Sequence, residues 1–325
     1  MTTSSSATLQ VRVARRTVEA QDICGLELAA VDGTPLPAFS AGSHIDVHLP
    51  GGIVRQYSLC NDPAEIHRYQ IAVLRDPASR GGSAAVHDLV AEGDALRISA
   101  PRNHFALAAD APSHLLLAGG IGVTPILCMA ERLAATQAGF QMHYACRSAE
   151  RMAFAERIRS SAFAPSVQLH FDEGAAEQRL NIAAVLASAA PGAHLYVCGP
   201  KGFMDAVLAA ARAAGWAEER LHWEFFAGAD ATPRADDGSF EVKIASSGRV
   251  IPVLPDQTIV QALSAAGIEV MMSCEQGVCG TCLTRVLEGE VDHRDSFLTP
   301  EEQAANDQFT PCCSRAKSAC LVLDL

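Results

Sequence analysis

Four cysteines near the C-terminus constrain this 325-residue chain more than any other feature. Three of them, Cys274, Cys279 and Cys282, follow a C-x4-C-x2-C spacing, and Cys312 comes after 29 further residues. This is the spacing of a plant-type [2Fe–2S] site, in which three thiolates from one loop and a fourth from elsewhere in the chain hold two irons. A fold that binds such a cluster must therefore bring residue 312 back to the loop.

The glycines of this loop agree with that interpretation. Gly277 and Gly280 stand where a side chain would obstruct the curl of the backbone around the irons, and their N–H groups can donate to the sulfurs. Cys313 is an alternative fourth ligand, and Cys312 is preferred because its spacing fits the plant-type pattern. Zinc is disfavoured because its sites usually take paired C-x-x-C motifs or histidines. The predicted cluster ligands are Cys274, Cys279, Cys282 and Cys312.

Residues 1–108 are expected to form an antiparallel β-barrel. Apolar and polar side chains largely alternate there in short segments, which Gly, Pro and Asp turns separate. This pattern predicts short strands at a spacing typical of a small barrel. The expected strands are 9–13, 23–28, 44–49, 53–59, 69–74 and 95–98, and a short helix is expected over 83–90.

Residues 109–228 are expected to form an α/β domain. Strand-length apolar runs alternate with segments of helical period, which is typical of βαβ units around a parallel sheet. The expected strands are 114–118, 142–146, 167–171 and 195–198, and the expected helices are 125–135, 152–160, 181–189 and 202–214.

The remaining residues form a linker and a third domain. Residues 229–238 are small and polar, with Pro and Gly among them, and predict a linker. Residues 239–325 then begin with a hairpin around Ser247-Gly248 and a helix that Asp256 can cap.

Two glycine turns at expected helix starts can bind phosphate. Residues 80–83 (Arg-Gly-Gly-Ser) open the short helix of the barrel, and residues 119–125 (Gly-Gly-Ile-Gly-Val-Thr-Pro) follow a buried strand. Such turns present N–H groups and the positive end of a helix dipole to an anion. Arg55 could hold one phosphate with the first turn, with Tyr57 beside a planar ring. Cys198-Gly199-Pro200 ends the last strand at the sheet edge where α/β folds bind ligands.

These motifs, in this order, resemble the ferredoxin–NADP reductase superfamily. With its C-terminal plant-type ferredoxin, the whole chain resembles the phthalate dioxygenase reductase family. The resemblance implies a multidomain protein with an antiparallel β-barrel flavin domain, an α/β parallel-sheet nicotinamide domain and an α+β ferredoxin domain of β-grasp type.

The resemblance also implies FMN rather than FAD, and NADH as the usual hydride donor. NADPH stays open, with Arg147 and Arg151 as the basic residues near the expected position of a 2′-phosphate, and Asp172 is a candidate for the ribose. The flavin residues that it assigns are Arg55, Gln56, Tyr57, Ser58, Ala72, Val73, Leu74, Arg80, Gly81, Gly82 and Ser83. The nicotinamide residues are Gly119, Gly120, Gly122, Thr124, Cys198, Gly199, Pro200 and Phe226, with Phe225 as the alternative aromatic.

The expected chemistry needs no side-chain acid or base. Hydride would pass near Thr124, Cys198 and Phe226 to the flavin, which joins a two-electron donor to a one-electron cluster. The expected function is that of the reductase component of a Rieske-type aromatic oxygenase or O-demethylase system. A reductase for a diiron or haem oxygenase or a quinone is the alternative, and an iron–sulfur redox sensor is a more distant one.

The charge of the chain fits a protein partner. The net charge is −12, and residues 236–325 carry 14 acidic and six basic side chains, or −8 of that total. Such a balance disfavours nucleic acid and anionic membranes, and an acidic ferredoxin domain suits a basic docking surface on a separate oxygenase. No apolar run is long enough to span a bilayer and no signal peptide is recognisable, so the expected location is the cytoplasm.

Overall fold

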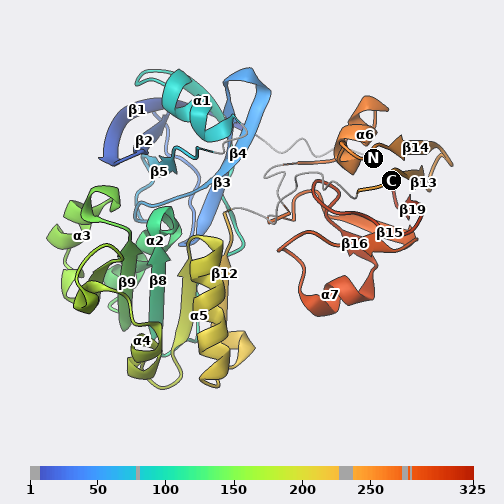
Figure 1. The fold of residues 1–325 in the computed structure, drawn as a ribbon. Coiled ribbons are helices and arrows are strands. Elements are labelled where there is room, and N and C mark those ends of the chain that lie inside the picture. The colour runs from blue at the N-terminus through green and yellow to red at the C-terminus, as the bar shows by residue number, and fades with distance from the viewer. Residues whose placement is uncertain (1–7, 78–80, 227–236, 273–276, 279) are drawn as a thin grey trace. The chain divides into compact units, whose positions relative to one another are not determined.

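The computed structural model describes residues 8–77, 81–226, 237–272, 277–278 and 280–325 (Figure 1). The chain divides into two compact units, residues 1–226 and residues 227–325. None of the described helices combines the length and the apolar character that a membrane span requires.

The N-terminal half of the larger unit is an antiparallel barrel, as predicted. Its elements are β1 (Thr8–Ala20), β2 (Ile23–Ala30), β3 (Ser43–Leu49), β4 (Ile53–Ser58), β5 (Tyr69–Leu74), α1 (Gly82–Leu89), β6 (Ala95–Ser99) and β7 (Arg102–Asn103). The strand order is β4-β3-β6-β1-β2-β5, with β7 paired to β3. The two end strands β4 and β5 also contact each other, so the sheet curves into a barrel. Alternate side chains such as Val11, Val13 and Ile45 fill its core.

The first strand is longer than its sequence pattern predicts. Alternation indicates a strand over 9–13, whereas β1 continues to Ala20. Irregularities in its pairing with β2, between Val13 and Arg15 and between Val18 and Ala20, shift the register along this extension. Such irregularities break the period-two pattern from which a strand is recognised.

The second half of the larger unit is a parallel α/β sheet, again as predicted. Its elements are β8 (His114–Gly119), α2 (Val123–Ala135), β9 (Phe140–Cys146), α3 (Ala155–Ser160), β10 (Val167–Phe171), α4 (Ile182–Ser188), β11 (His194–Cys198), α5 (Lys201–Ala213) and β12 (Leu221–Glu224). The strand order is β10-β9-β8-β11-β12, and all pairs are parallel. Leu116 and Tyr196 pack with α2 and α3, whereas Leu117 and Val197 pack with α4 and α5. The sequence pattern did not predict β12.

The smaller unit is an α+β domain. Its elements are β13 (Phe240–Ile244), β14 (Val250–Val253), α6 (Ile259–Ala265), β15 (Thr284–Glu288), β16 (Val291–Asp292), α7 (Pro300–Ala305), β17 (Gln308–Phe309), β18 (Arg315–Ala316) and β19 (Cys320–Leu323). The main sheet has the order β14-β13-β19-β15-β17, with β13 and β19 parallel and the other pairs antiparallel. Ile259 and Leu263 of α6 pack into the same core as Val242 and Leu321. The hairpin predicted around Ser247-Gly248 is formed by β13 and β14.

The cap of α6 and the start of α3 differ from those expected. Asp256 does not cap α6; the cap is Thr258, whose hydroxyl accepts from the Gln261 N–H in a capping box. The helix predicted over 152–160 begins at Ala155, because Phe154 has a φ of 60° and interrupts the helical conformation.

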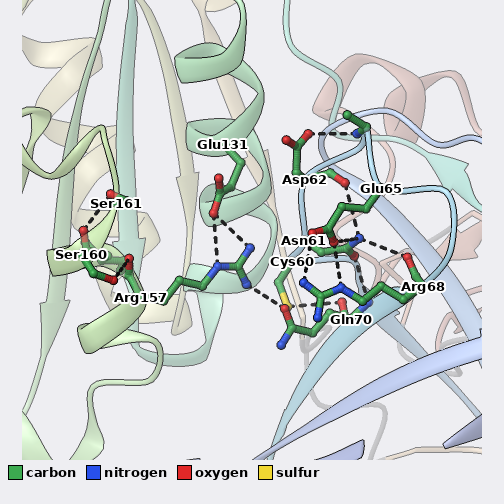
Figure 2. Close-up of polar contacts among 12 residues, drawn as sticks. Cys60, Asn61, Asp62, Glu65, Arg68, Gln70, Glu131, Arg157, Ser160 and Ser161 are labelled. Carbon is green, nitrogen blue, oxygen red and sulfur yellow. Dashed lines mark hydrogen bonds and ion pairs between the residues drawn. The ribbon is translucent and has the colours of Figure 1, made fainter. Parts of the chain in front are cut away.

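A polar network ties the barrel to the α/β sheet. Arg157 of α3 donates from Nε to Glu131 of α2 at 3.2 Å and from Nη1 to the side-chain oxygen of Gln70 on β5 at 2.7 Å (Figure 2). Gln70 is itself held by its neighbours, since its N–H donates to Asn61 at 2.9 Å and its carbonyl accepts from the Cys60 thiol at 3.2 Å. Arg157 therefore fixes β5 relative to the helices of the sheet.

We predict that Arg157→Met lowers the free energy of unfolding by about 1–2 kcal/mol, because the Glu131 carboxylate and the Gln70 amide lose a charged partner that is mostly screened from water. Urea unfolding would measure the change. Lys201→Met is the matched control. Its ion pair with Asp205 is largely exposed, with 66% and 51% of the two side chains accessible, and its loss should change stability by less than about 0.5 kcal/mol. Equal effects of the two substitutions would contradict the prediction.

Candidate functional site

The glycine turn and the Cys198 loop meet at the carboxyl edge of the parallel sheet. β8 ends at Gly119 beside β11, which ends at Cys198. A Cβ on Gly122 would stand 2.3 Å from the Cys198 carbonyl oxygen, and a Cβ on Gly199 would stand 2.9 Å from the Gly119 Cα. Only glycines allow backbones to approach this closely. The structure thus brings together the two segments that the sequence analysis assigned to the nicotinamide.

Thr124 stands in the first turn of α2 and is almost fully buried. Its hydroxyl donates to the Ile121 carbonyl at 3.1 Å, so the side chain braces the glycine turn. The N-terminal end of α2 faces the same sheet edge, and the unpaired N–H groups of such an end favour a negatively charged group. This arrangement fits a diphosphate.

Arg55 lies against the start of α1, as a shared phosphate site requires. Gly81, with a φ of 91°, precedes the helix, and a Cβ on Gly82 would stand 2.6 Å from Arg55 Cγ and 2.8 Å from its Nε. The Ser83 hydroxyl accepts from the Asp76 N–H at 3.1 Å. Arg80 lies outside the described residues. The described part of this group offers a guanidinium and a helix start to one anion, which fits a flavin phosphate.

Strands β4 and β5 carry the other predicted flavin residues, and β5 lies against the glycine turn of residues 120–122. Tyr57 is half-buried on β4, and burial raises the pKa of its hydroxyl, so the phenol stays protonated. Gln56 contacts the His44 ring through its side-chain amide at 3.2 Å. On β5, Ala72 and Val73 are buried and Leu74 is half-buried. Ala72 packs in the same apolar cluster as residues of α2, and β5 contacts the turn of residues 120–122.

Glu224 is a site residue that the sequence analysis missed. It ends β12, next to Cys198 on β11, and its carboxylate accepts from the Ser58 hydroxyl at 3.0 Å. Burial raises the pKa of Glu224 to about 7, although the Ser58 hydrogen bond lowers it. Burial and the nearby carboxylate also raise the pKa of the Cys198 thiol, which stays neutral. The only sequence signal was an acidic residue in an apolar run, Leu221 to Phe226.

Of the remaining nicotinamide candidates, one has an acidic partner and the others are exposed. Arg151 lies 3.5 Å from the Asp22 carboxylate of the barrel, so one of the two arginines considered for a 2′-phosphate has an acidic partner. Arg147 and Asp172 are exposed at the ends of β9 and β10. Phe226 lies two residues beyond Glu224, where β12 ends, and 36% of its surface is accessible.

The second site is the cysteine loop of the smaller unit. Cys282, Cys312 and Cys313 are buried together beside Val260. Cys274 and Cys279 lie outside the described residues. The thiols that the structure describes at this place have the chemistry of cluster ligands.

Both glycines of the cysteine loop have the conformation that the curl requires. Gly277 and Gly280 have φ values of 68° and 66°. A Cβ on Gly277 would stand 2.3 Å from Cys313 Sγ, and one on Gly280 would stand 2.2 Å from the Phe297 ring. A side chain at position 277 would therefore collide with the buried Cys313 thiol, and one at position 280 with the Phe297 ring, so the loop has the tight curl that a [2Fe–2S] cluster needs.

The raised pKa of Glu224 predicts a pH dependence of stability. A carboxyl that ionises near pH 4.5 in the unfolded chain and near 7 in the folded chain stabilises the fold below that window, and this stability is lost as pH rises through about 7. The free energy of unfolding of the unsubstituted protein should therefore fall by up to about 3 kcal/mol relative to Glu224→Gln between pH 4.5 and 8. Denaturant titrations across this range would measure it. Glu173→Gln, at an exposed carboxylate, is the control and should parallel the unsubstituted protein; a parallel Glu224→Gln profile would contradict the prediction.

Comparison with known proteins gives the same two parts. The model of the 2Fe-2S iron-sulfur cluster binding domain matches residues 242–317, and that of the N-terminal domain of dimethylamine monooxygenase subunit DmmA-like proteins matches residues 96–221. A vanillate O-demethylase oxidoreductase from a Pseudomonas species (strain HR199) is 57% identical over 98% of this chain and all of its own length. Another, from Pseudomonas putida, is 60% identical over 96% of this chain and 98% of its own.

The solved structures agree with the relatives. A phthalate dioxygenase reductase, described as a modular structure for electron transfer from pyridine nucleotides to [2Fe–2S], superposes with a TM-score of 0.80 at 40% identity, covering 98% of each chain. These comparisons confirm the multidomain fold and the expected cofactors of the family, FMN, a [2Fe–2S] cluster and NADH. The chain is an oxidoreductase and belongs to the phthalate dioxygenase reductase family, as the order of its motifs indicated.

Proposed function

We propose that this chain is the reductase component of an aromatic O-demethylase system of Rieske type, in which it passes electrons from NADH to a separate oxygenase. The observation that carries the proposal is the similarity to vanillate O-demethylase oxidoreductases along nearly the whole chain. A methoxy-substituted aromatic acid is accordingly the substrate class of the oxygenase, and this chain does not bind it.

The cofactors explain why one chain contains both sites. A flavin accepts two electrons with a hydride and releases them one at a time, and so connects a nicotinamide to a cluster that accepts one electron. The protein contributes positioning. Arg55 and the start of α1 would hold the flavin phosphate, and Tyr57 and Ser58 would flank the ring. The turn of residues 119–122 and the Cys198 loop would bind the nicotinamide nucleotide.

The groups at the reacting edge are suited to this positioning role. The neutral Cys198 thiol and the braced Thr124 are both buried at this edge, so they would hold the two loops in place behind a nicotinamide ring. The Ser58–Glu224 pair keeps a proton available at a hydroxyl of the barrel, since a carboxyl with a pKa of about 7 exchanges its proton at neutral pH.

The charge of the smaller unit suits delivery to another protein. Its net charge of −8 would steer it toward a basic surface around the electron entry point of an oxygenase, and such steering weakens as salt increases. Cys24, Cys60, Cys128, Cys146 and Cys198 of the larger unit are free thiols, which supports the cytoplasm as the place of the reaction.

NADH-driven turnover with purified oxygenases is the direct test. The purified chain would be combined with Rieske-type demethylases and a panel of methoxy- and carboxy-aromatics, and product formation would be followed. We expect demethylation of methoxy-aromatic acids, with rates that fall as ionic strength rises. Coupling only to a haem or diiron oxygenase, or direct reduction of quinones at higher efficiency than any oxygenase, would instead support the alternative acceptors.

Substitution of a cluster ligand should separate the two sites. We predict that Cys279→Ser removes the visible spectrum of the cluster and electron delivery to proteins, because three thiolates cannot replace four, but spares NADH oxidation by ferricyanide, which the flavin alone can support. Iron analysis and both assays would measure this. An equal loss of ferricyanide reduction would contradict separate sites.

The choice between two neighbouring thiols is also testable. We predict that Cys312→Ser loses most of the bound iron and acid-labile sulfide, whereas Cys313→Ser keeps both, because the Cys313 thiol contacts the Thr310 hydroxyl at 3.2 Å and lies where Gly277 closes the loop. The two residues are similarly buried, so each variant serves as the control for the other. Iron loss confined to Cys313→Ser would assign Cys313 as the ligand.

A further inference from the structure

A buried acidic residue stands where the chain enters the smaller unit. Asp237 directly follows residues 227–236, with which the smaller unit begins, and only 4% of its side chain is accessible. Arg294 donates to both of its carboxylate oxygens, from Nη1 at 3.0 Å and from Nη2 at 2.5 Å. Nε of Arg315 lies 3.6 Å from the same carboxylate. We call Asp237, Arg294 and Arg315 the entry clamp.

The two arginines of the entry clamp are anchored to the body of the unit independently of Asp237. Arg294 donates from Nε to Asp292 at 2.7 Å. Arg315 stacks over the Phe240 ring at 5.1 Å, and its guanidinium donates to the carbonyls of Leu254 and Gln257. It also donates to the carbonyl of Gly238, next to Asp237 in the incoming segment. Both side chains are at least nine-tenths buried. Asp237 is thus the member that attaches the incoming segment to an existing framework.

The same framework reaches the fourth cluster ligand. Arg315 is three residues beyond Cys312, and the Arg294 N–H donates to the Ser314 hydroxyl at 3.2 Å. Ser314 in turn donates to Asp295 at 3.5 Å. The point at which the chain enters the unit and the loop that carries Cys312 are therefore parts of one hydrogen-bonded network.

Stability alone does not explain such a group. A buried ion pair often contributes no more to stability than apolar residues of the same size, because its charges must first leave water. What a two-bond guanidinium–carboxylate contact does supply is a fixed geometry. Here the geometry that it fixes is the position and direction of the backbone at residue 237.

We propose that Asp237 is a positioning residue for electron transfer from the flavin to the cluster. In that step the reduced flavin loses one electron and the cluster gains it. The inference rests on the NADH-to-flavin-to-cluster path and not on the identity of the final acceptor. Residues 227–236 precede Asp237, and ten residues span at most about 36 Å; with Asp237 released and Gly238 still held by Arg315 the limit becomes about 40 Å, and with both released it becomes about 47 Å. The effective concentration of the cluster near the flavin then falls.

The test uses full-length protein loaded with FMN and cluster, mixed with NADH under anaerobic stopped-flow conditions. In Asp237→Asn, which keeps the shape but removes the charge, we expect flavin reduction at the unsubstituted rate and cluster reduction slowed by about 1.5-fold or more, as a connection lengthened from ten to thirteen residues implies. Arg294→Lys keeps the charge but cannot form both bonds, and should show the same pattern. Asp324→Asn, at an exposed carboxylate 4.0 Å from Arg285 in the same unit, is the control and should alter neither phase.

Two measurements besides turnover separate positioning from other roles. Small-angle X-ray scattering should show a larger radius of gyration for Asp237→Asn than for Asp324→Asn, and the midpoint potential of the cluster should be the same in both. An unchanged rate of cluster reduction would overturn the proposal. So would equal slowing of both phases, a slowing matched by a shift in potential, or loss of the cluster from both clamp variants. Failure to couple to any oxygenase would bear only on the proposed acceptor.

Discussion

The close approach of two loops at the carboxyl edge of the parallel sheet is the constraint on which the larger unit depends. Gly122 has no space for a side chain beside the Cys198 carbonyl, and Gly199 has none beside Gly119. Because backbone meets backbone there, the start of α2 stands next to the end of β11, and β5 of the barrel reaches the same turn. A larger residue at either glycine would separate the two loops and with them the α/β and barrel halves of the unit.

Polar contacts between residues far apart in sequence then hold these halves in place. Ser58 and Glu224 are 166 positions apart, and Gln70 and Arg157 are 87 apart. Each joins the barrel to the α/β sheet, and each is partly shielded from water, where a hydrogen bond to a charged group is strong and an unpaired one is costly. The raised pKa of Glu224 is a consequence of this shielding.

The sequence predicted what local constraints determine. The barrel, the parallel sheet and the glycine turns were predicted, because strand period, helix period and glycine conformation are properties of short segments. The cap of α6 was misassigned to Asp256 because two residues near the helix start can accept hydrogen bonds, and only the backbone of the folded chain selects Thr258. Glu224 and the entry clamp were missed for a different reason. Their roles depend on contacts with residues far away in the sequence, and the spacing of residues along the chain does not show which distant residues will meet.

The two transfers make different demands on the fold, and the division of the chain follows from them. Hydride transfer needs contact between donor and acceptor, so the barrel and the α/β sheet share one unit and one apolar cluster. An electron can cross a gap, so the cluster can occupy a second unit that a covalent segment joins to the first, and the same cluster remains available to an external acceptor. The segment that joins the units can serve both electron transfer within the chain and delivery to an external acceptor only if the point at which it is attached is fixed. Two arginines that the second unit already holds, closing on the carboxylate of Asp237, define it.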